Sequence, residues 1–551
     1  MDSGRRPRTN RPAALVAGAT AVLMTLLAAC SSGGAGEKAA GTAPKAGGTL
    51  RLAIEKEPEC LDPHQSPTAS ARLLARPLVD SLVHQDAKGA FQPWLASRWT
   101  VSADRLTYTF ELRDDVRFTD GTAFDAAAVV ANLEHVADPA TKSLLASSLI
   151  SAYDSSRAVA PHTVEVKLKR PDSGFLGALA LPNLGIEAPA TLKGSPASLC
   201  QKIIGTGPFR SDTGLVAQKG IEYTRNADYA WAPKGAAHQG KAHLDGIEVK
   251  IVPDNASRFG ALSSSQVDAV TGLAPTSLRE LKSTSGFALH KSQFPGINYS
   301  YWPNTESGPL ADVRVRKALR AGIDWPQIVK RVHFGEYEAA AGVLSSRTPG
   351  YAAELAPDYA HDPDAAAKLL DEAGWKTRDA QGYRTKDGKR LKVRHLWSDP
   401  SISNLAVQIQ AAAKELGIET VEENVDGGTF VKRLLAGDYE LIDTSFSAPG
   451  PDVLRVLFGK ENIPTPERGI SNNMARYDNP EAERLFEAAQ RAKDREEEFG
   501  IYQDVQRLIT EDAAVLPVYS PLSSLAARSA VHGVAFNADG SADLYGVWLT
   551  S

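Results

Sequence analysis

The most restrictive feature of this sequence is a regular alternation of strand and helix patterns that begins at Lys392. The segments LKVRHLW, IETVEENV and YELIDTSF are short and rich in residues that favour strands, and the two segments between them repeat apolar residues with helical spacing. A strand, a helix and a second strand in this order form a βαβ unit, which places the strands in parallel and covers the sheet with helices. The chain is therefore expected to be an α/β protein.

The earlier part of the chain has a different pattern. Apolar and polar residues alternate over short runs, as in TLRLAI, LTYTFEL, VEVKLK and IEVKIV, so each run predicts a strand with one buried face. Helix starts are indicated by Asp312, Asp362 and Asn479, because such side chains cap the first turn of a helix. Gly374 stands where the helix after Asp362 should end.

Length and charge limit the kinds of partner. About 500 residues follow the Gly-rich segment that ends at Gly48, which is too many for one core and predicts two or three domains. The chain has 61 Lys and Arg against 66 Asp and Glu, and its net charge of -5 gives no electrostatic case for nucleic acid. Its hydrophobic content of 43% is ordinary for a folded protein.

The N-terminus has the pattern of a lipoprotein export signal. Basic residues precede an apolar run, 13–29, which is marginal as a membrane span because a span needs roughly 20 apolar residues. Leu27 to Cys30 resembles the bacterial lipobox, so residues 1–29 are expected to be a signal peptide and Cys30 to carry lipid. Residues 30–48 predict a flexible linker. An uncleaved signal anchor is the alternative, and the export route stays open.

The remaining cysteines form an even pair. The chain contains three cysteines, and once Cys30 is assigned to the lipid, Cys60 and Cys200 are left. Since the chain is expected outside the cytosol, a disulfide between them is the leading expectation. Two buried free thiols are the alternative.

Six segments in order carry a family resemblance. They run from about Gly47 to the C-terminal region: GGTLRLAIEKEPECLDPHQS, PWLASRWTVSADRLTYTFELRDDVRFTDGTAFDAAAVVANLEH, IGTGPFR, DVRVRKALRAGID, AAKLLDEAGW and EDAAVLPVY. Together they resemble extracellular solute-binding protein family 5, which comprises the oligopeptide, dipeptide and nickel receptors of ABC importers.

The resemblance implies a two-lobed periplasmic-binding-protein-like α/β fold, type II, of the large peptide-receptor subclass. It also implies an extra subdomain inserted in the first lobe, and a first lobe completed by C-terminal strands near Leu516 to Tyr519. The expected boundaries are 49–80, 183–298 and 517–551 for the first lobe, 81–182 for the inserted subdomain and 299–516 for the second lobe.

The same resemblance implies a function. The chain is expected to be a substrate-binding lipoprotein of an ABC importer, anchored on the outer face of the cell membrane and acting as a monomer without a cofactor. It would capture a solute between the lobes, and closure would present it to the permease subunits. An oligopeptide is the leading ligand, and a sugar, a metallophore or a capped peptide stays open.

Candidate ligand-binding residues follow from strand ends and from the expected lobe boundary. Sites in α/β sheets form beyond the C-terminal ends of strands, and aromatic side chains in a cleft offer a large contact area. The candidates, each of which has burial in the core as its alternative, are Trp397, Ser398, Ser445 and Phe446 at strand ends and Tyr299, Tyr301 and Trp302 in INYSYWPN.

One candidate is tied to a departure from the peptide receptors. In those relatives, the segment similar to SFSAPGPD carries an aspartate that pairs with the α-amino group of the peptide, and here that position is Pro449. Asp452 lies three residues later and is the candidate substitute. Removing an ammonium group from water without a paired carboxylate is costly, so this segment is expected to govern the class of ligand.

Enzyme signatures are poor. The chain has no GxSxG, HExxH or CxxC motif, so no catalytic residue is assigned. His64 could ligate a metal, but no second His is near it in sequence, and an ordinary loop residue is preferred with no metal site assigned. The adjacent pairs Asp114 with Asp115 and Glu422 with Glu423 are expected on solvated surfaces. A surface-anchored enzyme, or an adhesion or sensor module on the same fold, is the alternative function.

Overall fold

The computed structural model describes residues 43–86, 88–143, 145–398, 402–469 and 471–550. The chain divides into a segment that ends at Ala43 and a body that begins at Pro44. The expected signal peptide, Cys30 and most of the expected linker lie outside the described residues.

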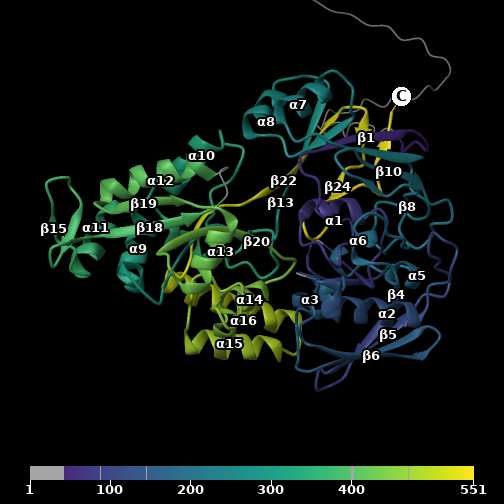
Figure 1. The fold of residues 1–551 in the computed structure, drawn as a ribbon, viewed down its shortest axis with the longest axis horizontal. Helices are drawn as coiled ribbons and strands as arrows, with labels where there is room; N and C mark the ends of the chain where they lie inside the picture. The colour runs from purple at the N-terminus through teal and green to yellow at the C-terminus, as the bar shows by residue number, and fades with distance from the viewer. Residues whose placement is uncertain (1–42, 87, 144, 399–401, 470, 551) are drawn as a thin grey trace, which may run out of the picture. The chain divides into compact units, whose positions relative to one another are not determined.

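The first lobe is built on a mixed sheet around β1 (Figure 1). β1 is parallel to both of its neighbours, β11 and β12, and begins two residues after Gly47. The strands follow the order β13-β22-β12-β1-β11-β10-β8, with β9 beside β10. Their bounds are β1 (Thr49–Ile54), β8 (Phe209–Arg210), β9 (Leu215–Val216), β10 (Gly220–Arg225), β11 (Gly246–Ile251), β12 (Ala269–Thr271), β13 (Phe287–Gln293) and β22 (Leu522–Arg528).

The inserted subdomain has a sheet of its own, in the order β4-β5-β7-β6. Its strands are β4 (Ala96–Val101), β5 (Thr107–Leu112), β6 (Tyr153–Ala160) and β7 (Thr163–Leu168), and α2 (Ala126–Ala137) packs against them. Asp125 caps α2 by accepting a hydrogen bond from the backbone of Ala128. One hydrophobic cluster contains both Leu52 of β1 and Phe110 of β5, so the subdomain shares its core with the first lobe.

The second lobe has the βαβ order that its sequence predicts. The sheet runs β19-β18-β20-β14-β21, and β18 is parallel to β19 and β20. Its strands are β14 (Gly296–Pro303), β18 (Lys392–Trp397), β19 (Glu419–Asn424), β20 (Leu441–Ser447) and β21 (Leu516–Tyr519). The helices of this lobe are α9 (Val313–Gly322), α10 (Trp325–Val332), α11 (Pro363–Glu372), α12 (Ser403–Leu416), α13 (Gly427–Ala436), α14 (Val453–Phe458), α15 (Pro480–Gln490) and α16 (Arg495–Glu511).

The helix caps expected from the sequence are present. Asp312, Asp362 and Asn479 each accept a hydrogen bond from a backbone N–H in the first turn of α9, α11 and α15. Gly374 has a φ of +92° just after α11, a conformation that favours glycine.

Two strand pairs carry the chain between the lobes. β13 continues into β14, and β21 continues into β22, and β13 pairs with β22 along its whole length (Figure 1). The expected boundary needs a correction, because Leu516–Tyr519 pairs with β14 in the second lobe and only the next strand, β22, returns to the first lobe. The crossings therefore lie just before Gly296 and just after Tyr519.

Smaller elements complete the body. They are β2 (Val83–Gln85), β3 (Phe91–Pro93), β15 (Thr377–Arg378), β16 (Arg384–Lys386), β17 (Lys389–Arg390), β23 (Val531–His532), β24 (Ala535–Phe536), β25 (Ala542–Asp543), β26 (Trp548–Leu549), α1 (Ala69–Ala75), α3 (Ala146–Leu149), α4 (Phe175–Ala178), α5 (Pro189–Leu192), α6 (Pro196–Leu199), α7 (Asn255–Ser263) and α8 (Pro275–Lys282). Across the described ranges, no helix combines the length and the apolar character that a bilayer span requires.

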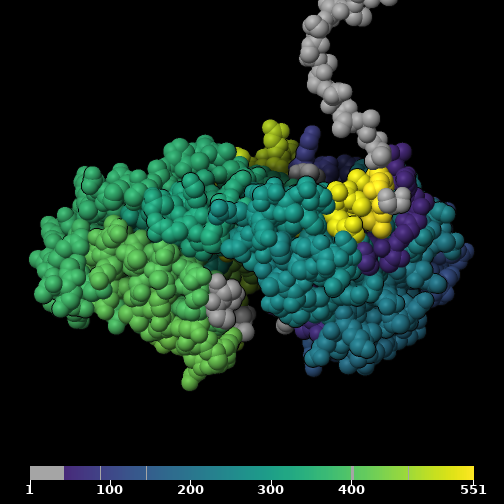
Figure 2. All heavy atoms as spheres, turned by 90° about the horizontal axis from the view of Figure 1, so that it is seen from above, coloured from purple at the N-terminus to yellow at the C-terminus, as the bar shows by residue number. Residues whose placement is uncertain are grey.

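A disulfide joins Cys60 to Cys200, the pairing expected from the sequence, and so links the loop after β1 to the end of α6. On the face shown in Figure 2, the surface is hollowed between the teal atoms of the first lobe and the green atoms of the second.

Candidate ligand-binding site

A cavity of about 1010 Å³, partly open to solvent, is lined by residues of both lobes. The first lobe and its inserted subdomain contribute α1, β2, β3, the loop before α4 and the segment around α3. The second lobe contributes the end of β20, the loop 448–452, α14 and the start of α16. Apolar side chains from both sides form part of the wall: Phe91, Leu149, Leu181, Phe446 and Val453.

Hydrogen bonds between the lobes border the cavity. Gln85 donates from Nε2 to the backbone oxygen of Pro449 at 3.4 Å, and Ser447 donates from Oγ to the backbone oxygen of Asp539 at 3.3 Å. Ser173 donates its backbone N–H to Oε1 of Gln490 at 3.0 Å. The walls are thus held close by a few polar contacts, as expected for two bodies that close on a solute.

The charged side chains that line the cavity are mostly paired. Arg72 lies 3.2 Å from Asp539 within the first lobe. In the second lobe, Arg455 lies 2.8 Å from Asp452, and Arg495 lies 3.5 Å from Glu498. The guanidinium of Arg495 also lies over the rings of Phe91 and Phe499, at 4.9 and 4.7 Å from their centroids.

Two buried carboxyl groups at this site have raised pKa values. Burial, together with the negative charge of Asp452, raises the pKa of Asp172 to about 6. Burial also raises the pKa of Glu498 to about 7, although Arg495 opposes the shift. Both groups therefore lie in surroundings that disfavour negative charge unless a cation compensates it.

Residues 90–460 match the model of the bacterial extracellular solute-binding proteins, family 5. The chain belongs to this family. As a family 5 solute-binding protein it is a transport receptor of an ABC importer and not an enzyme, which removes the surface enzyme from the alternatives.

Two curated relatives are similar over most of their length. The chain is 28% identical over 537 residues to the probable di/tripeptide-binding protein 5 of Pseudomonas aeruginosa, covering 91% of this chain and 95% of that protein. It is also 28% identical over 463 residues to the glutathione-binding protein GsiB of Escherichia coli, covering 83% of this chain and 86% of that protein.

Solved structures have the same fold. NikA from Brucella suis, in complex with Fe(III)-EDTA, gives a TM-score of 0.79 at 26% identity, covering 91% of this chain and all of that one, 100%. DppA from Helicobacter pylori, in complex with the peptide STSA, gives a TM-score of 0.74 at 24% identity, covering 92% and 99%. The two-lobed fold expected from the sequence is confirmed.

Of the candidate residues of this family 5 protein, Phe446 and Asp452 line the cavity. The carboxylate of Asp452 is already engaged, because it accepts hydrogen bonds from Arg455 at 2.8 and 2.9 Å, from Tyr502 at 2.5 Å and from Gln490 at 2.6 Å. Burial alone would raise the pKa of Asp452, but Arg455 and these hydrogen bonds outweigh it and hold the pKa below its usual value. Asp452 thus ties α14 to α15 and α16 and has little capacity left for a ligand ammonium.

The three aromatic candidates at the expected lobe boundary were predicted to bind the ligand, but the structure places them in the core instead. Tyr299, Tyr301 and Trp302 are 7%, 1% and 0% exposed, and none is among the residues that line the cavity. They lie in β14, which is paired on both sides and buried along its whole length, so both of its faces meet a core. Trp302 stacks on Phe458 of α14 with ring centroids 5.2 Å apart.

The remaining candidates lie near strand ends but outside the cavity wall. Trp397 is half-buried against the core of the second lobe, and its Nε1 has no hydrogen-bond acceptor among the described residues. Ser398 and Ser445 are exposed. Of the four strand-end candidates, Phe446 alone lies in the cavity wall.

Sequence reasoning missed a buried network in the second lobe. His395 of β18, 1% exposed, contacts Glu422 of β19 at 2.6 Å and Asp443 of β20 at 3.0 Å, and Tyr299 donates to Asp443. Burial opposes protonation of His395, but hydrogen bonds to Asp443 and Glu422 outweigh it and raise its pKa. The prediction that Glu422 lies on a solvated surface is therefore wrong, because this side chain is half-buried. Asp114 and Asp115 are exposed, as predicted.

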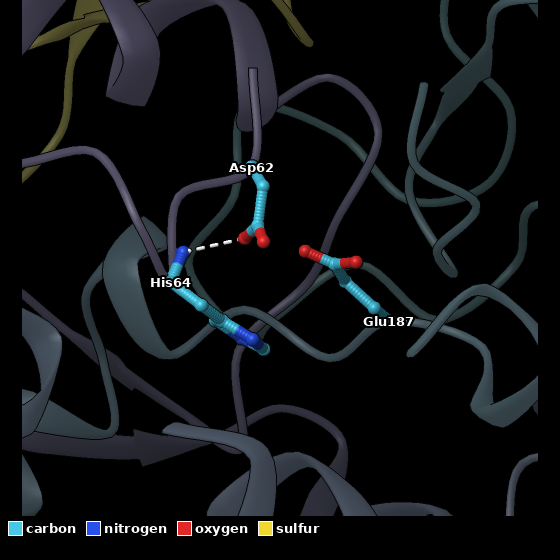
Figure 3. Close-up of side chains that lie close together, drawn as sticks. All are labelled: Asp62, His64 and Glu187. Carbon is cyan, nitrogen blue, oxygen red and sulfur yellow. Dashed lines mark hydrogen bonds between the residues drawn. The ribbon is translucent and has the colours of Figure 1, made fainter. Parts of the chain in front are cut away.

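One cluster has the composition of a metal site. Asp62, His64 and Glu187 are fully buried or nearly so, and one potential ligand atom from each lies within 4.8 Å of the others (Figure 3). Both ring nitrogens of His64 already have protein partners, since Nε2 lies 2.9 Å from the backbone oxygen of Gly185 and Nδ1 lies 3.1 Å from Nδ1 of His135. His64 therefore presents no free ligand atom.

The two carboxyl groups of this cluster face one another (Figure 3). Asp62 accepts hydrogen bonds from the backbone of His64 and from Gln65, both at 2.7 Å, whereas neither oxygen of Glu187 has a partner among the described residues. Burial and the proximity of Asp62 raise the pKa of Glu187 well above its usual value. A proton on Glu187 accounts for the pair, and no metal site is assigned.

Proposed function

We propose that this family 5 protein is the lipid-anchored receptor of its importer and that it binds a peptide-like solute of a few residues in the cavity between the lobes. The observation that carries the proposal is the cavity itself, whose wall combines residues of both lobes. A solute that fills it contacts both bodies and so favours the closed state, the state that a permease would recognise.

The nature of the wall supports a peptide-like ligand. The space between the two lobes at this site is about 1010 Å³ when its open mouth is included. Phe91, Phe446 and Val453 offer apolar area to side chains, and Asp172, Arg495 and Asn472 offer polar contacts. The peptide named in the first curated relative, a di- or tripeptide, points the same way.

Calorimetry on the purified protein tests the proposal. The probes are a pool of di- and tripeptides, glutathione, common mono- and disaccharides, and the ferric and nickel chelates of small organic acids. We expect binding from the peptide pool or from glutathione. Binding of a sugar or a chelate, with no heat from any peptide, would replace the proposed ligand class.

A matched pair of variants tests the location. Phe446→Ala removes a ring from the cavity wall and is expected to weaken binding about tenfold or more, because burying such a side chain contributes about 1.5 to 3 kcal/mol. Phe334→Ala removes a ring that is 47% exposed outside this cavity and should leave the affinity unchanged. Equal effects of the two changes would contradict the site.

A further inference from the structure

The charges of the cavity wall do not balance. Among the described residues that line it, three arginines face four carboxyl groups: Arg72, Arg455, Arg495, Asp172, Asp452, Glu498 and Asp539. Each arginine pairs with a different one of these carboxylates: Arg72 with Asp539, Arg455 with Asp452, and Arg495 with Glu498. Arg455 also lies 3.9 Å from Glu461, which is outside the cavity wall. The carboxyl group left over is Asp172.

Asp172 is built into the wall. It stands between β7 and α4 in the inserted subdomain and is only 2% exposed. Its Oδ1 accepts a hydrogen bond of 2.9 Å from the backbone N–H of Gly174, and its Oδ2 has no donor in the part of the chain that the structure describes. No cationic side chain of the described residues lies within 4 Å of it.

A buried carboxylate without a cationic partner is costly in the empty protein. The nearby charges do not remove this cost. Asp452 repels the carboxylate of Asp172, and Arg455 and the exposed Arg170 attract that carboxylate only from beyond ion-pair distance. Arg455 is not available to Asp172, because its guanidinium already donates to both carboxylate oxygens of Asp452. An added positive charge beside Asp172 would neutralise the wall.

We infer that Asp172 is the counter-ion for a cationic group of the ligand, an ammonium or a guanidinium, which enters the cavity on the side of the inserted subdomain. This inference rests on the proposed function and deepens it, because it names the ligand class as peptides or other solutes that carry a positive charge. It also assigns recognition of the ligand's charge to Asp172 of the first lobe, whereas the sequence suggested Asp452 in the loop 448–452 of the second lobe.

The expected size of the effect follows from the type of contact. A hydrogen bond to a charged group contributes enough to change affinity by about tenfold to a hundredfold. Binding should also weaken as the pH falls through about 6, because protonation of Asp172 removes the charge that the ligand needs. The titratable and charged groups that face Asp172 are Asp452, Arg455, Arg170 and Tyr108.

The test uses chemically matched pools. A pool of di- and tripeptides that contain no arginine or histidine is divided, and one half is acetylated at all amines, which removes the positive charge of each amino group. Native mass spectrometry then reports which masses the purified protein retains, for the wild type, for Asp172→Asn and for the control Asp154→Asn. Asp154 is an exposed aspartate of the same subdomain, so its change removes one charge away from the cavity.

We expect the wild type and Asp154→Asn to retain amine-bearing peptides and to reject the acetylated pool, and Asp172→Asn to lose the amine-bearing peptides by tenfold or more. Retention of acetylated peptides by the wild type overturns the inference, and so does unchanged retention by Asp172→Asn. Thermal unfolding of the empty Asp172→Asn protein serves as the folding check. Because the change removes an unpaired buried charge, its melting temperature should equal or exceed that of the wild type.

A second arm separates this inference from the proposed function. If no peptide of either pool is retained, the peptide proposal fails, and a set of small organic cations with uncharged and anionic compounds of matched size is screened by thermal shift. The assignment of Asp172 then stands only if a cation binds and Asp172→Asn abolishes that binding. A set in which only uncharged or anionic compounds bind, or in which nothing binds, overturns it.

Discussion

At the scale of single residues, the same side-chain type has opposite roles on the two walls of one cavity. Asp452 is saturated by Arg455, Tyr502 and Gln490, and it holds three helices of the second lobe together. Asp172 accepts one backbone hydrogen bond and has no cation beside it among the described residues. The number of donors around a carboxylate, and not its position in a motif, decides whether it serves the fold or the ligand.

The role of Asp452 predicts a loss of stability in Asp452→Asn. Removing one partner of a buried ion pair leaves the other charge uncompensated, which costs about 3 to 5 kcal/mol. We expect the free energy of unfolding, measured with urea, to fall by about that amount. Adding Arg455→Met should recover part of the loss, because the double variant leaves no stranded cation.

Asp478→Asn is the matched control for that prediction. Asp478 pairs with Lys460 at the surface of the same lobe, and the two side chains are 46% and 59% exposed. Such pairs contribute about 0 to 1 kcal/mol, so this change should hardly affect unfolding. If Asp452→Asn unfolded like the wild type and lost only peptide affinity, Asp452 would be a ligand clamp instead.

At the scale of elements, three neighbouring strands of the second lobe are joined by one imidazole. His395 on β18 bridges Glu422 on β19 and Asp443 on β20, and Asp443 also accepts a hydrogen bond from Tyr299 on β14. Each residue lies on a different strand, so the network ties the sheet across its hydrogen-bonded width. A protonated His395 compensates the two carboxylates, which is consistent with its raised pKa.

This network predicts a pH dependence with a definite sign. Because the pKa of His395 is higher in the folded protein than the usual 6.5, its stabilising contribution is fully present below about pH 6.5 and is lost as the pH rises through the folded value. We expect urea unfolding to show a larger loss of stability between pH 6 and pH 9 in the wild type than in His395→Gln.

The control for this prediction is His361→Gln, which changes an exposed imidazole of the same lobe. It should have the same pH dependence as the wild type. An equal loss in all three proteins between pH 6 and pH 9 would show that His395 is neutral in the fold and that the network depends on other protons.

At the scale of the whole molecule, long-range connections define the first lobe. β22 comes from the C-terminal part of the chain and pairs with β12 and β13. The disulfide closes a stretch of 140 residues between Cys60 and Cys200, which spans the entire inserted subdomain. The bridge thus joins the two stretches of the first lobe between which the subdomain is inserted.

The disulfide predicts a measurable contribution to stability. In the chain-entropy model, closing a loop of this length stabilises the fold by about 4 to 5 kcal/mol. We expect no free thiol from Cys60 or Cys200 in the denatured, unreduced protein, and a lower unfolding free energy for the double change Cys60→Ser and Cys200→Ser. Titration of both thiols without a reductant would contradict the bridge.

Anchoring is a prediction about the intact chain. If Cys30 carries lipid, Cys30→Ala should release the protein into the medium or leave it as an unprocessed precursor, as followed by fractionation and by mass spectrometry of the N-terminus. Cys60→Ser, which changes a cysteine of the body, should leave anchoring intact. A processed Cys30→Ala protein without lipid that stays on the membrane would contradict the lipoprotein assignment.

Local residue patterns and the order of the motifs were enough to predict many of the elements and the family. Alternation and caps located β1, β5, β7, β11, α9, α11 and α15, because these signals depend on neighbours a few residues apart. The order of strand, helix and strand after Lys392 specified the parallel part of the second sheet. The ordered motifs specified the fold, and the expected export of the chain favoured a disulfide over two free thiols without excluding the thiols.

Which side chains reach the cavity depends on how distant segments of the chain pack together. Tyr299, Tyr301 and Trp302 have the composition of a binding surface, but β14 is a central strand with a core on each face, and its place in the sheet depends on β20 and β21, far along the chain. Asp172 lies in the segment RPDSG, which matches no binding motif. Whether a cation lies beside it depends on the positions of Arg455 in α14 and Arg495 in α16, which are far along the chain. The burial and the charge pairing of a side chain depend on residues that are distant in sequence, so local sequence patterns cannot predict them.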